Sequence, residues 1–275
     1  MRVLLLCGVI LWLAGCKKAA PPANPEEICA QYDMLAHSAL TGTSRKALVF
    51  IDRSSSAVSD EATRRIFVEA LKKHIEDNLW IRNSEMRVFF VHGRTTGRAD
   101  VRVFRQGVSV PNPSPYDLEQ KEECLAYREK VRDQMRKAYD SLQTLVALPP
   151  EGRVARATDL WGILEVISEE ASSDTSSPPV YVLVLSDLLE CMPGAERRCF
   201  EEHPPGSRTE AEAWAREDAK KLVKMYRISL PAIRRARYTF ISGTFANREA
   251  SRYVRYYWLA LLEALGVPSE HIKVQ

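Results

Sequence analysis

Two short, continuous apolar runs constrain the fold of this chain more than any other feature of its sequence. They are ALVFI at 47–51 and VYVLVLS at 180–186, and each is followed by an aspartate, Asp52 or Asp187. Continuous rather than alternating apolar residues are typical of strands that are buried on both faces. The two runs therefore predict the central strands of a parallel sheet.

Strand and helix patterns alternate along most of the remaining chain. Further strands are predicted at 86–92, 100–106 and 237–243, and helices at 59–79, 117–147, 158–171, 209–226 and 248–265. The strand at 100–106 alternates polar and apolar residues, which favours a place near an edge. The pattern predicts an α/β fold with a doubly wound, mostly parallel sheet and helices on both faces, similar to a Rossmann fold. Ligands of such sheets bind at the carboxyl ends of the strands.

The N-terminus has the organisation of an export signal. Residues 1–16, MRVLLLCGVILWLAGC, hold one arginine, an apolar run and then small residues before Cys16. The last four, LAGC, resemble the lipobox of bacterial lipoproteins, in which the signal is cut before the cysteine and the thiol carries a diacylglycerol. The resemblance implies a signal peptide at 1–15 and lipidation of Cys16. An ordinary secretory signal with a chance cysteine is the alternative.

The residues after Cys16 predict a tether and a location. In a Gram-negative cell an aspartate after the lipidated cysteine would favour the inner membrane, so Lys17 favours the periplasmic side of the outer membrane. We assign 16–40 to the lipidated N-terminus and tether, because KKAAPPANPEE is rich in proline and lacks large apolar residues. The stretch 26–40 predicts a short helix within this segment, and 41–275 forms the domain.

Export would place the remaining cysteines in an oxidising compartment. Cys29, Cys124, Cys191 and Cys199 form an even set. Cys191 and Cys199 flank a Pro-Gly turn, which favours a bond between them, and Cys29 would then pair with Cys124. Three pairings of four cysteines are possible, and four free thiols are the alternative. Zinc is disfavoured, because the chain has no CxxC spacing and no clustered histidines.

Polar residues after the first apolar run form the main functional motif. Asp52, Ser54 and Ser56 spell D-x-S-x-S. This motif resembles the metal-ion-dependent adhesion site (MIDAS) of von Willebrand factor A (vWA) domains. Those domains have a doubly wound sheet, and they add a threonine from a later loop and an aspartate after the fourth strand. Thr158 and Asp187 stand at the matching positions, and the resemblance covers about residues 45–267.

The resemblance implies a site for Mg²⁺, or for Mn²⁺ or Ca²⁺ in its place. Mg²⁺ prefers hard oxygen ligands in octahedral geometry. Ser54 and Ser56 would bind the ion directly, and Thr158 directly or through water. Asp52 and Asp187 would act through waters and hydrogen bonds to the serines. Each residue alone also fits a plain structural role, as a hydroxyl that caps amides or a carboxylate at a strand end.

The resemblance implies a lipid-anchored envelope protein that is not an enzyme. Its domain would bind a protein partner that offers an acidic residue to the ion, and the loop 188–208 would select that partner. A scaffold with a degenerate, metal-free site is the alternative. A metal-dependent hydrolase ranks last, because no nucleophile elbow or phosphate-binding glycine loop is present. The net charge of +3 is too small to indicate nucleic-acid binding.

Overall fold

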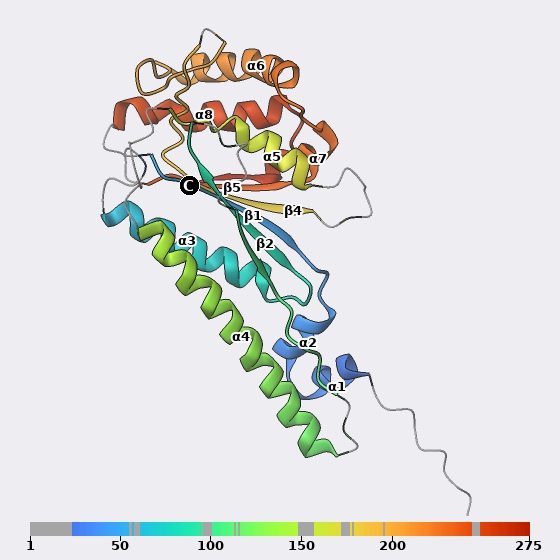
Figure 1. Cartoon of the computed structure of the whole chain (residues 1–275). Helices are drawn as coiled ribbons and strands as arrows, with labels where there is room; N and C mark the ends of the chain where they lie inside the picture. The colour runs from blue at the N-terminus through green and yellow to red at the C-terminus, as the bar shows by residue number, and fades with distance from the viewer. Residues whose placement is uncertain are drawn as a thin grey trace, which may run out of the picture.

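The computed structural model describes residues 24–275, except 55–56, 58–60, 94, 96–100, 113, 115, 148–156, 172–176, 178, 195 and 244–247. The described chain forms a six-stranded sheet with helices on both faces (Figure 1). The strands are β1 (Lys46–Asp52), β2 (Glu85–Val91), β3 (Arg102–Arg105), β4 (Val180–Leu185), β5 (Arg237–Ile241) and β6 (Ile272–Val274). Their order across the sheet is β3-β2-β1-β4-β5-β6.

Parallel pairing dominates the sheet. β1 lies between β2 and β4 and is parallel to both, and β5 and β6 continue in the same direction. β3 is antiparallel and largely exposed at one edge, where its alternating pattern placed it. The predicted α/β class with a mostly parallel sheet is therefore confirmed. β6 was not predicted, because three residues are too few to show a pattern.

Helices cover the two faces of the sheet and explain its continuous apolar strands. They are α1 (Pro25–Tyr32), α2 (Met34–Thr41), α3 (Glu61–Leu79), α4 (Asp117–Ala147), α5 (Gly162–Glu170), α6 (Arg208–Met225), α7 (Leu230–Arg235) and α8 (Arg248–Ala264). Val49 and Ile51 of β1 pack in a cluster with α3 and α4, whereas Leu48 and Phe50 pack with α5, α6, α7 and α8. Both faces of β1 are thus buried, as a central strand requires.

A helical stalk projects from the sheet (Figure 1). It consists of α1, α2 and the N-terminal half of α4, which enclose a third apolar cluster containing Ile28, Leu40, Tyr127 and Val131. The disulfide Cys29–Cys124 crosses this cluster. The C-terminal part of the segment assigned to the tether is therefore helical and packed. Among the described helices, none combines the length and the apolar character needed to cross a membrane.

The stalk contains two helices where the sequence predicted one over 26–40. Asp33 interrupts them with an extended backbone at φ −150°. Its carboxylate accepts hydrogen bonds from the amides of Leu35 and Ala36, both at 2.9 Å, and so caps α2. Arg128 of α4 contacts the other carboxylate oxygen at 2.8 Å. Asp33 therefore ends one helix, starts the next and ties both to α4.

Candidate functional site

The carboxyl ends of β1 and β4 are joined by a hydrogen bond between side chains. The Ser186 hydroxyl donates to Asp52 Oδ2 at 2.6 Å, and the amide of Ser54 donates to Asp52 Oδ1 at 2.8 Å. Asp52 is fully buried. These strands are neighbours, yet the chain leaves β1 toward β2 and leaves β4 toward β5 on the other side. Ligands of open α/β sheets bind at this kind of topological switch point.

Ser54 and Asp187 lie at the same edge and form turn hydrogen bonds. Ser54 Oγ accepts from the amide of Ala57 at 3.4 Å, and Asp187 Oδ1 accepts from the amide of Leu189 at 3.0 Å. Both side chains are buried. Such bonds are the plain structural role that each residue also fits. Ser56 lies outside the described residues, so its part in the site stays a prediction.

Leu188, which follows Asp187 after β4, has an unusual backbone conformation. Its φ of 65° is in the left-handed region, which glycine adopts easily and leucine rarely. The amide of Leu188 donates to Ser186 Oγ at 2.9 Å, and its carbonyl accepts from Trp258 Nε1 at 3.0 Å. Ser186 and Trp258 therefore hold Leu188 in a backbone conformation that suits glycine.

Thr158 reaches this edge through backbone pairing with the loop after β4. Its amide donates to the carbonyl of Cys191 at 2.8 Å, and the amide of Cys191 donates back at 3.1 Å. The next amide, that of Asp159, donates to the carbonyl of His92 after β2 at 3.1 Å. Thr158 thus lies between the loops that follow β2 and β4.

The prediction that Thr158 opens a helix is wrong. α5 begins at Gly162, because acidic side chains bind the amides before it. Glu190 Oε2 accepts from Leu160 at 2.7 Å and Trp161 at 3.2 Å, and Asp159 Oδ1 accepts from Gly162 at 3.0 Å. The residues before α5 are therefore fixed to the loop after β4, and the helix starts only after Trp161.

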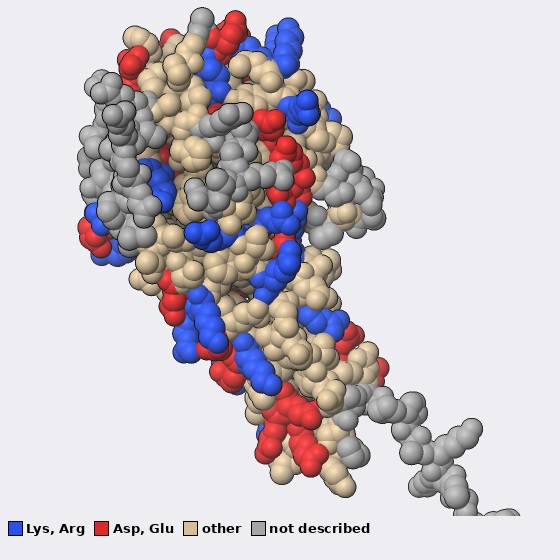
Figure 2. All heavy atoms as spheres, viewed as in Figure 1, with Lys and Arg blue, Asp and Glu red and all other residues tan. Residues whose placement is uncertain are grey.

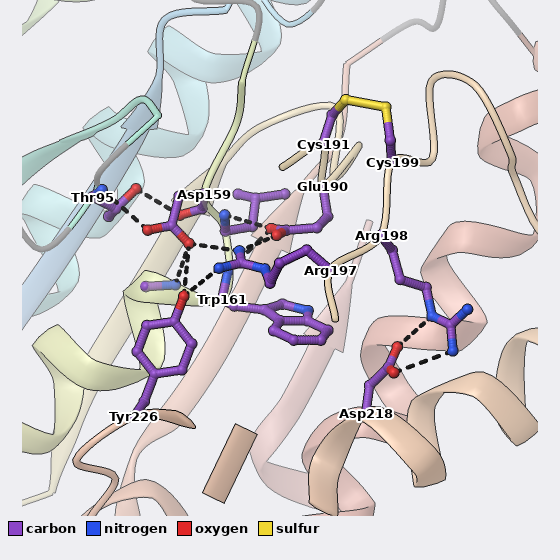
Figure 3. Close-up of polar contacts among 12 residues, drawn as sticks. Thr95, Asp159, Trp161, Glu190, Cys191, Arg197, Arg198, Cys199, Asp218 and Tyr226 are labelled. Carbon is purple, nitrogen blue, oxygen red and sulfur yellow. Dashed lines mark hydrogen bonds and ion pairs between the residues drawn. A yellow bond between two sulfur atoms is a disulfide. The ribbon is translucent and has the colours of Figure 1, made fainter. Parts of the chain in front are cut away.

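A half-buried arginine, Arg197, connects these acidic side chains, as Figure 3 shows. Arg197 Nη2 lies 2.8 Å from Asp159 Oδ1 and also contacts Glu190, while Nη1 donates to the Tyr226 hydroxyl. The guanidinium lies 4.7 Å from the ring centre of Trp161. Next to it, the predicted disulfide Cys191–Cys199 is present. The loop after β4 is therefore fixed by both a covalent bond and a buried ion network.

Burial controls the charge of the acidic groups at this edge. It raises the pKa of Glu190 to about 8, although Arg197 favours the ionised form. Burial also raises the pKa of Asp52, against hydrogen bonds from Ser186 and Ser54 that lower it. The charge of Glu201 adds to this rise, so the loop 188–208 is close enough to act on Asp52. A cation beside Asp52 would offset the cost of burying its charge.

Ser186 and Arg197 are residues of this edge that sequence reasoning missed. Ser186 had a signal, because it is the only serine or threonine in the apolar run VYVLVLS and precedes Asp187. Arg197 had a weaker one, as an arginine between two cysteines in a loop expected beside acidic residues. Neither position belongs to the D-x-S-x-S motif, so the motif does not predict a role for either residue.

All candidate ligand atoms of the predicted metal site are oxygens. Asp52, Ser54, Thr158 and Asp187 offer only carboxylates and hydroxyls, the ligand types that Mg²⁺ and Ca²⁺ prefer. Within the described ranges, no cluster of three or more His, Cys, Asp or Glu residues is arranged to hold a metal. The predicted site needs no such cluster, because three of its five residues contribute hydroxyls.

Comparisons with known proteins found structural likeness only. No family model matches the chain, and no curated protein matches it. Similar solved structures include two crystal structures of proximal thread matrix protein 1 from the mussel byssus, with TM-scores of 0.37 and identities of 13% and 12%. A third, with a zinc-occupied MIDAS motif, has a TM-score of 0.36 and 11% identity.

Each alignment covers 85% of this chain but only 43–44% of the mussel protein. The chain therefore spans less than half the length of those structures. Its assigned features remain an α/β fold with two disulfides and acidic residues at the switch point of the sheet.

Proposed function

We propose that this chain is a lipid-anchored envelope protein whose vWA-like domain binds a protein partner through a divalent cation. The observation that most supports the proposal is the hydrogen bond between Ser186 and Asp52. It brings the D-x-S-x-S strand and the strand that precedes Asp187 together at the switch point, where ligands of such sheets bind. The lipid anchor is supported by the LAGC sequence that ends at Cys16.

The chain's own residues have separate tasks in this proposal. Ser54, Ser56 and Thr158 would hold the cation, and Asp52 and Asp187 would neutralise part of its charge. Ser186 would orient Asp52. The bound cation would supply a positive charge that coordinates a carboxylate oxygen of the partner's acidic side chain. Holding the cation and the partner involves no bond cleavage, so the proposed role is binding and not catalysis.

A metal-free scaffold is the second candidate, and a specific observation favours it. Asp52, Ser54 and Asp187 accept hydrogen bonds from neighbouring amides, and Ser186 adds a hydroxyl. These bonds would keep the edge folded without a cation. Partner binding would then depend on the loop 188–208 or on a helix face.

Metal titration separates the two candidates. The chain from Ala19 onward contains every residue of the three apolar clusters, so it retains the described fold. We expect Mg²⁺ or Mn²⁺ to give a binding heat in calorimetry and to raise the melting temperature. At about 100 times the dissociation constant, the ion should stabilise the fold by about 2.7 kcal/mol.

Asp52→Ala should abolish both signals, because it removes the carboxylate that joins β1 to β4. The matched control is Asp117→Ala, which removes an exposed carboxylate at the end of the stalk and should leave both signals intact. If the unaltered chain gives neither heat nor thermal shift with Mg²⁺, Mn²⁺ or Ca²⁺, the metal-binding function is rejected and the scaffold remains.

A further inference from the structure

A groove of about 900 Å³ lies between α6, α7 and α8, on the face of the sheet opposite α3 and α4 (Figure 1). We call it the α6–α8 groove. One wall is a row of charged residues at i, i+4 spacing along α6: Arg208, Glu212, Arg216, Lys220 and Lys224. Because a helix rises about 1.5 Å per residue, this row extends about 24 Å.

The floor of the groove is apolar. It is lined by Ala219 and Val223 of α6, Leu230 of α7, Ala260 of α8 and Leu265, which follows α8. The Val223 side chain is 44% exposed, so it adds accessible apolar surface to the floor. The floor therefore offers apolar contact to a ligand that can enter the groove.

Positive charge dominates the rim. Five cationic and two acidic side chains line the groove. One of the acids, Glu212, contacts Arg208 at 2.7 Å and Arg216 at 3.5 Å. In the part of the chain that the structure describes, neither Lys220 nor Lys224 forms an ion pair. The two lysines are exposed, so their charge is available to a ligand.

Arg234 closes one end of the groove in a fixed position. Its Nε donates to the carbonyl of Leu265 at 3.1 Å. Gly266 makes this approach possible, because its φ is +88° and a Cβ atom there would lie 2.5 Å from Arg234 Nε. The end of the groove is therefore preorganised and carries a positive charge.

We propose that the α6–α8 groove binds an acidic amphipathic segment of a protein partner. The apolar side of such a segment would cover Val223 and the floor, and its carboxylates would face Lys220 and Lys224. A helix of about 16 residues matches the length of the row on α6, and helices with one apolar face commonly bind in grooves of this kind.

An anionic membrane surface fits the groove less well. Apart from Val223, the floor lies recessed between the helices, with Ala219, Ala260 and Leu265 buried, so a flat bilayer would meet the rim and leave these residues uncovered. Glu212 and Glu263 also line the groove and would face the lipid phosphates. Binding here requires no metal ion, so this proposal can fail or succeed independently of the proposed function.

Three labelled peptides of about 18 residues test the proposal. The first carries leucines on one helical face and glutamates on the other, the second has lysines in place of the glutamates, and the third has serines in place of the leucines. Fluorescence anisotropy is measured in EDTA at about 50 mM salt, where charge is weakly screened, with the chain from Ala19 onward. We expect only the acidic amphipathic peptide to bind.

Lys220→Glu/Lys224→Glu should weaken that binding at least about tenfold, because two attractive charges become repulsive. Lys72→Glu/Lys130→Glu is the matched control. It makes the same change in net charge at exposed positions of α3 and α4, and should alter binding less than about twofold. Circular dichroism and melting temperatures confirm that both variants fold.

Several outcomes would overturn the proposal. These are no binding of the acidic amphipathic peptide, equal binding of the lysine peptide, or equal weakening by the two double variants. Vesicles of phosphatidylglycerol provide the remaining test. If they bind the chain while the acidic peptide does not, and Lys220→Glu/Lys224→Glu abolishes that binding, the groove is a membrane contact and not a protein-binding site.

Discussion

At the scale of single residues, His74 shows how the fold controls a charge. It lies on α3, and its Nε2 atom is enclosed without a hydrogen-bond partner among the described residues. Its Nδ1 lies 3.4 Å from Asn78 Nδ2. Burial lowers the pKa of His74 from 6.5 to about 4, and the charge of Asp77 opposes this only in part. The folded ring is therefore neutral at pH values where the unfolded chain binds a proton.

This difference predicts a loss of stability in acid. The contribution of His74 to the free energy of unfolding is fully present above pH 6.5 and is lost as the pH falls toward 4. In this pH range only the unfolded chain gains the proton. After allowance for the partial exposure of the ring, we expect a loss of about 2 kcal/mol. Urea unfolding at several pH values should show a smaller loss in His74→Gln than in the unaltered chain.

The matched control for this comparison is His203→Gln, which changes an exposed histidine in the loop before α6. Each variant is compared with the unaltered chain through the slope of unfolding free energy against pH, so a constant loss of stability in either variant does not affect the result. Identical slopes for His74→Gln and the unaltered chain would contradict the assignment.

At the scale of elements, the stalk is a unit with its own core. Its apolar cluster contains Cys29 and Cys124 and is distinct from the two clusters that cover the sheet. Elements with separate cores can open without unfolding the remainder. The link between α1 and α4 therefore determines whether the stalk stays docked.

Removing the stalk disulfide should loosen the stalk selectively. We expect Cys29→Ser/Cys124→Ser to lose about 2–5 kcal/mol of stability and amide protection in α1 and α2, while β1 and β4 keep theirs. Hydrogen exchange with mass spectrometry measures both regions. In the control, Cys191→Ser/Cys199→Ser, the loss should instead appear around Thr158 and the loop after β4. A uniform loss over sheet and stalk in the first variant would show that the two are one cooperative unit.

Long periodic elements could be predicted from the sequence, and short ones could not. The helix predicted over 117–147 coincides with α4, and the apolar runs coincide with β1 and β4. β6 and α7 are too short to show a period. The start of α5 depends on Glu190, which is distant in sequence from the amides it binds. Local pattern contains no information about such a contact.

The same limit applies to the candidate site. Asp52 and Asp187 could be placed at strand ends because each follows an apolar run. Their geometry depends on contacts such as that between Asp52 and Ser186, which are 134 residues apart. The network around Arg197 likewise joins three separate loops. The sequence therefore indicates which edge of the sheet carries the candidate site, but not the side-chain contacts that position its residues.

At the scale of the whole molecule, the stalk and the α6–α8 groove lie at opposite ends (Figure 1). Figure 2 shows carboxylates gathered at the free end of the stalk, over α4. Exposed Asp117, Glu119 and Glu122 belong to this region, as do exposed Tyr116 and Leu118. Because α1 is part of the stalk, an anchor at Cys16 would hold this end near the membrane. The groove would then face away from it.

The proposed lipid anchor predicts a fractionation result. The full chain should be found in the membrane fraction, with its N-terminus at Cys16 and a mass increased by lipid. Cys16→Ser should abolish the lipid mass and the membrane association, because the thiol that carries the diacylglycerol is lost. Cys7→Ser is the control, since that residue lies in the proposed signal peptide, which would be removed. Membrane association without lipid, or an uncut N-terminus, would contradict the anchor.

The two disulfides also impose an order on maturation. Cys191 and Cys199 are separated by 8 residues, whereas Cys29 and Cys124 are separated by 95. Closing the longer loop costs more chain entropy, and its sulfurs meet only after α1 and α4 have docked. In the proposed export, which would start from the N-terminus, Cys29 would emerge long before its partner. Its thiol must then stay reduced or undergo exchange until α4 arrives, so oxidative folding of the stalk depends on thiol–disulfide exchange more than that of the loop after β4.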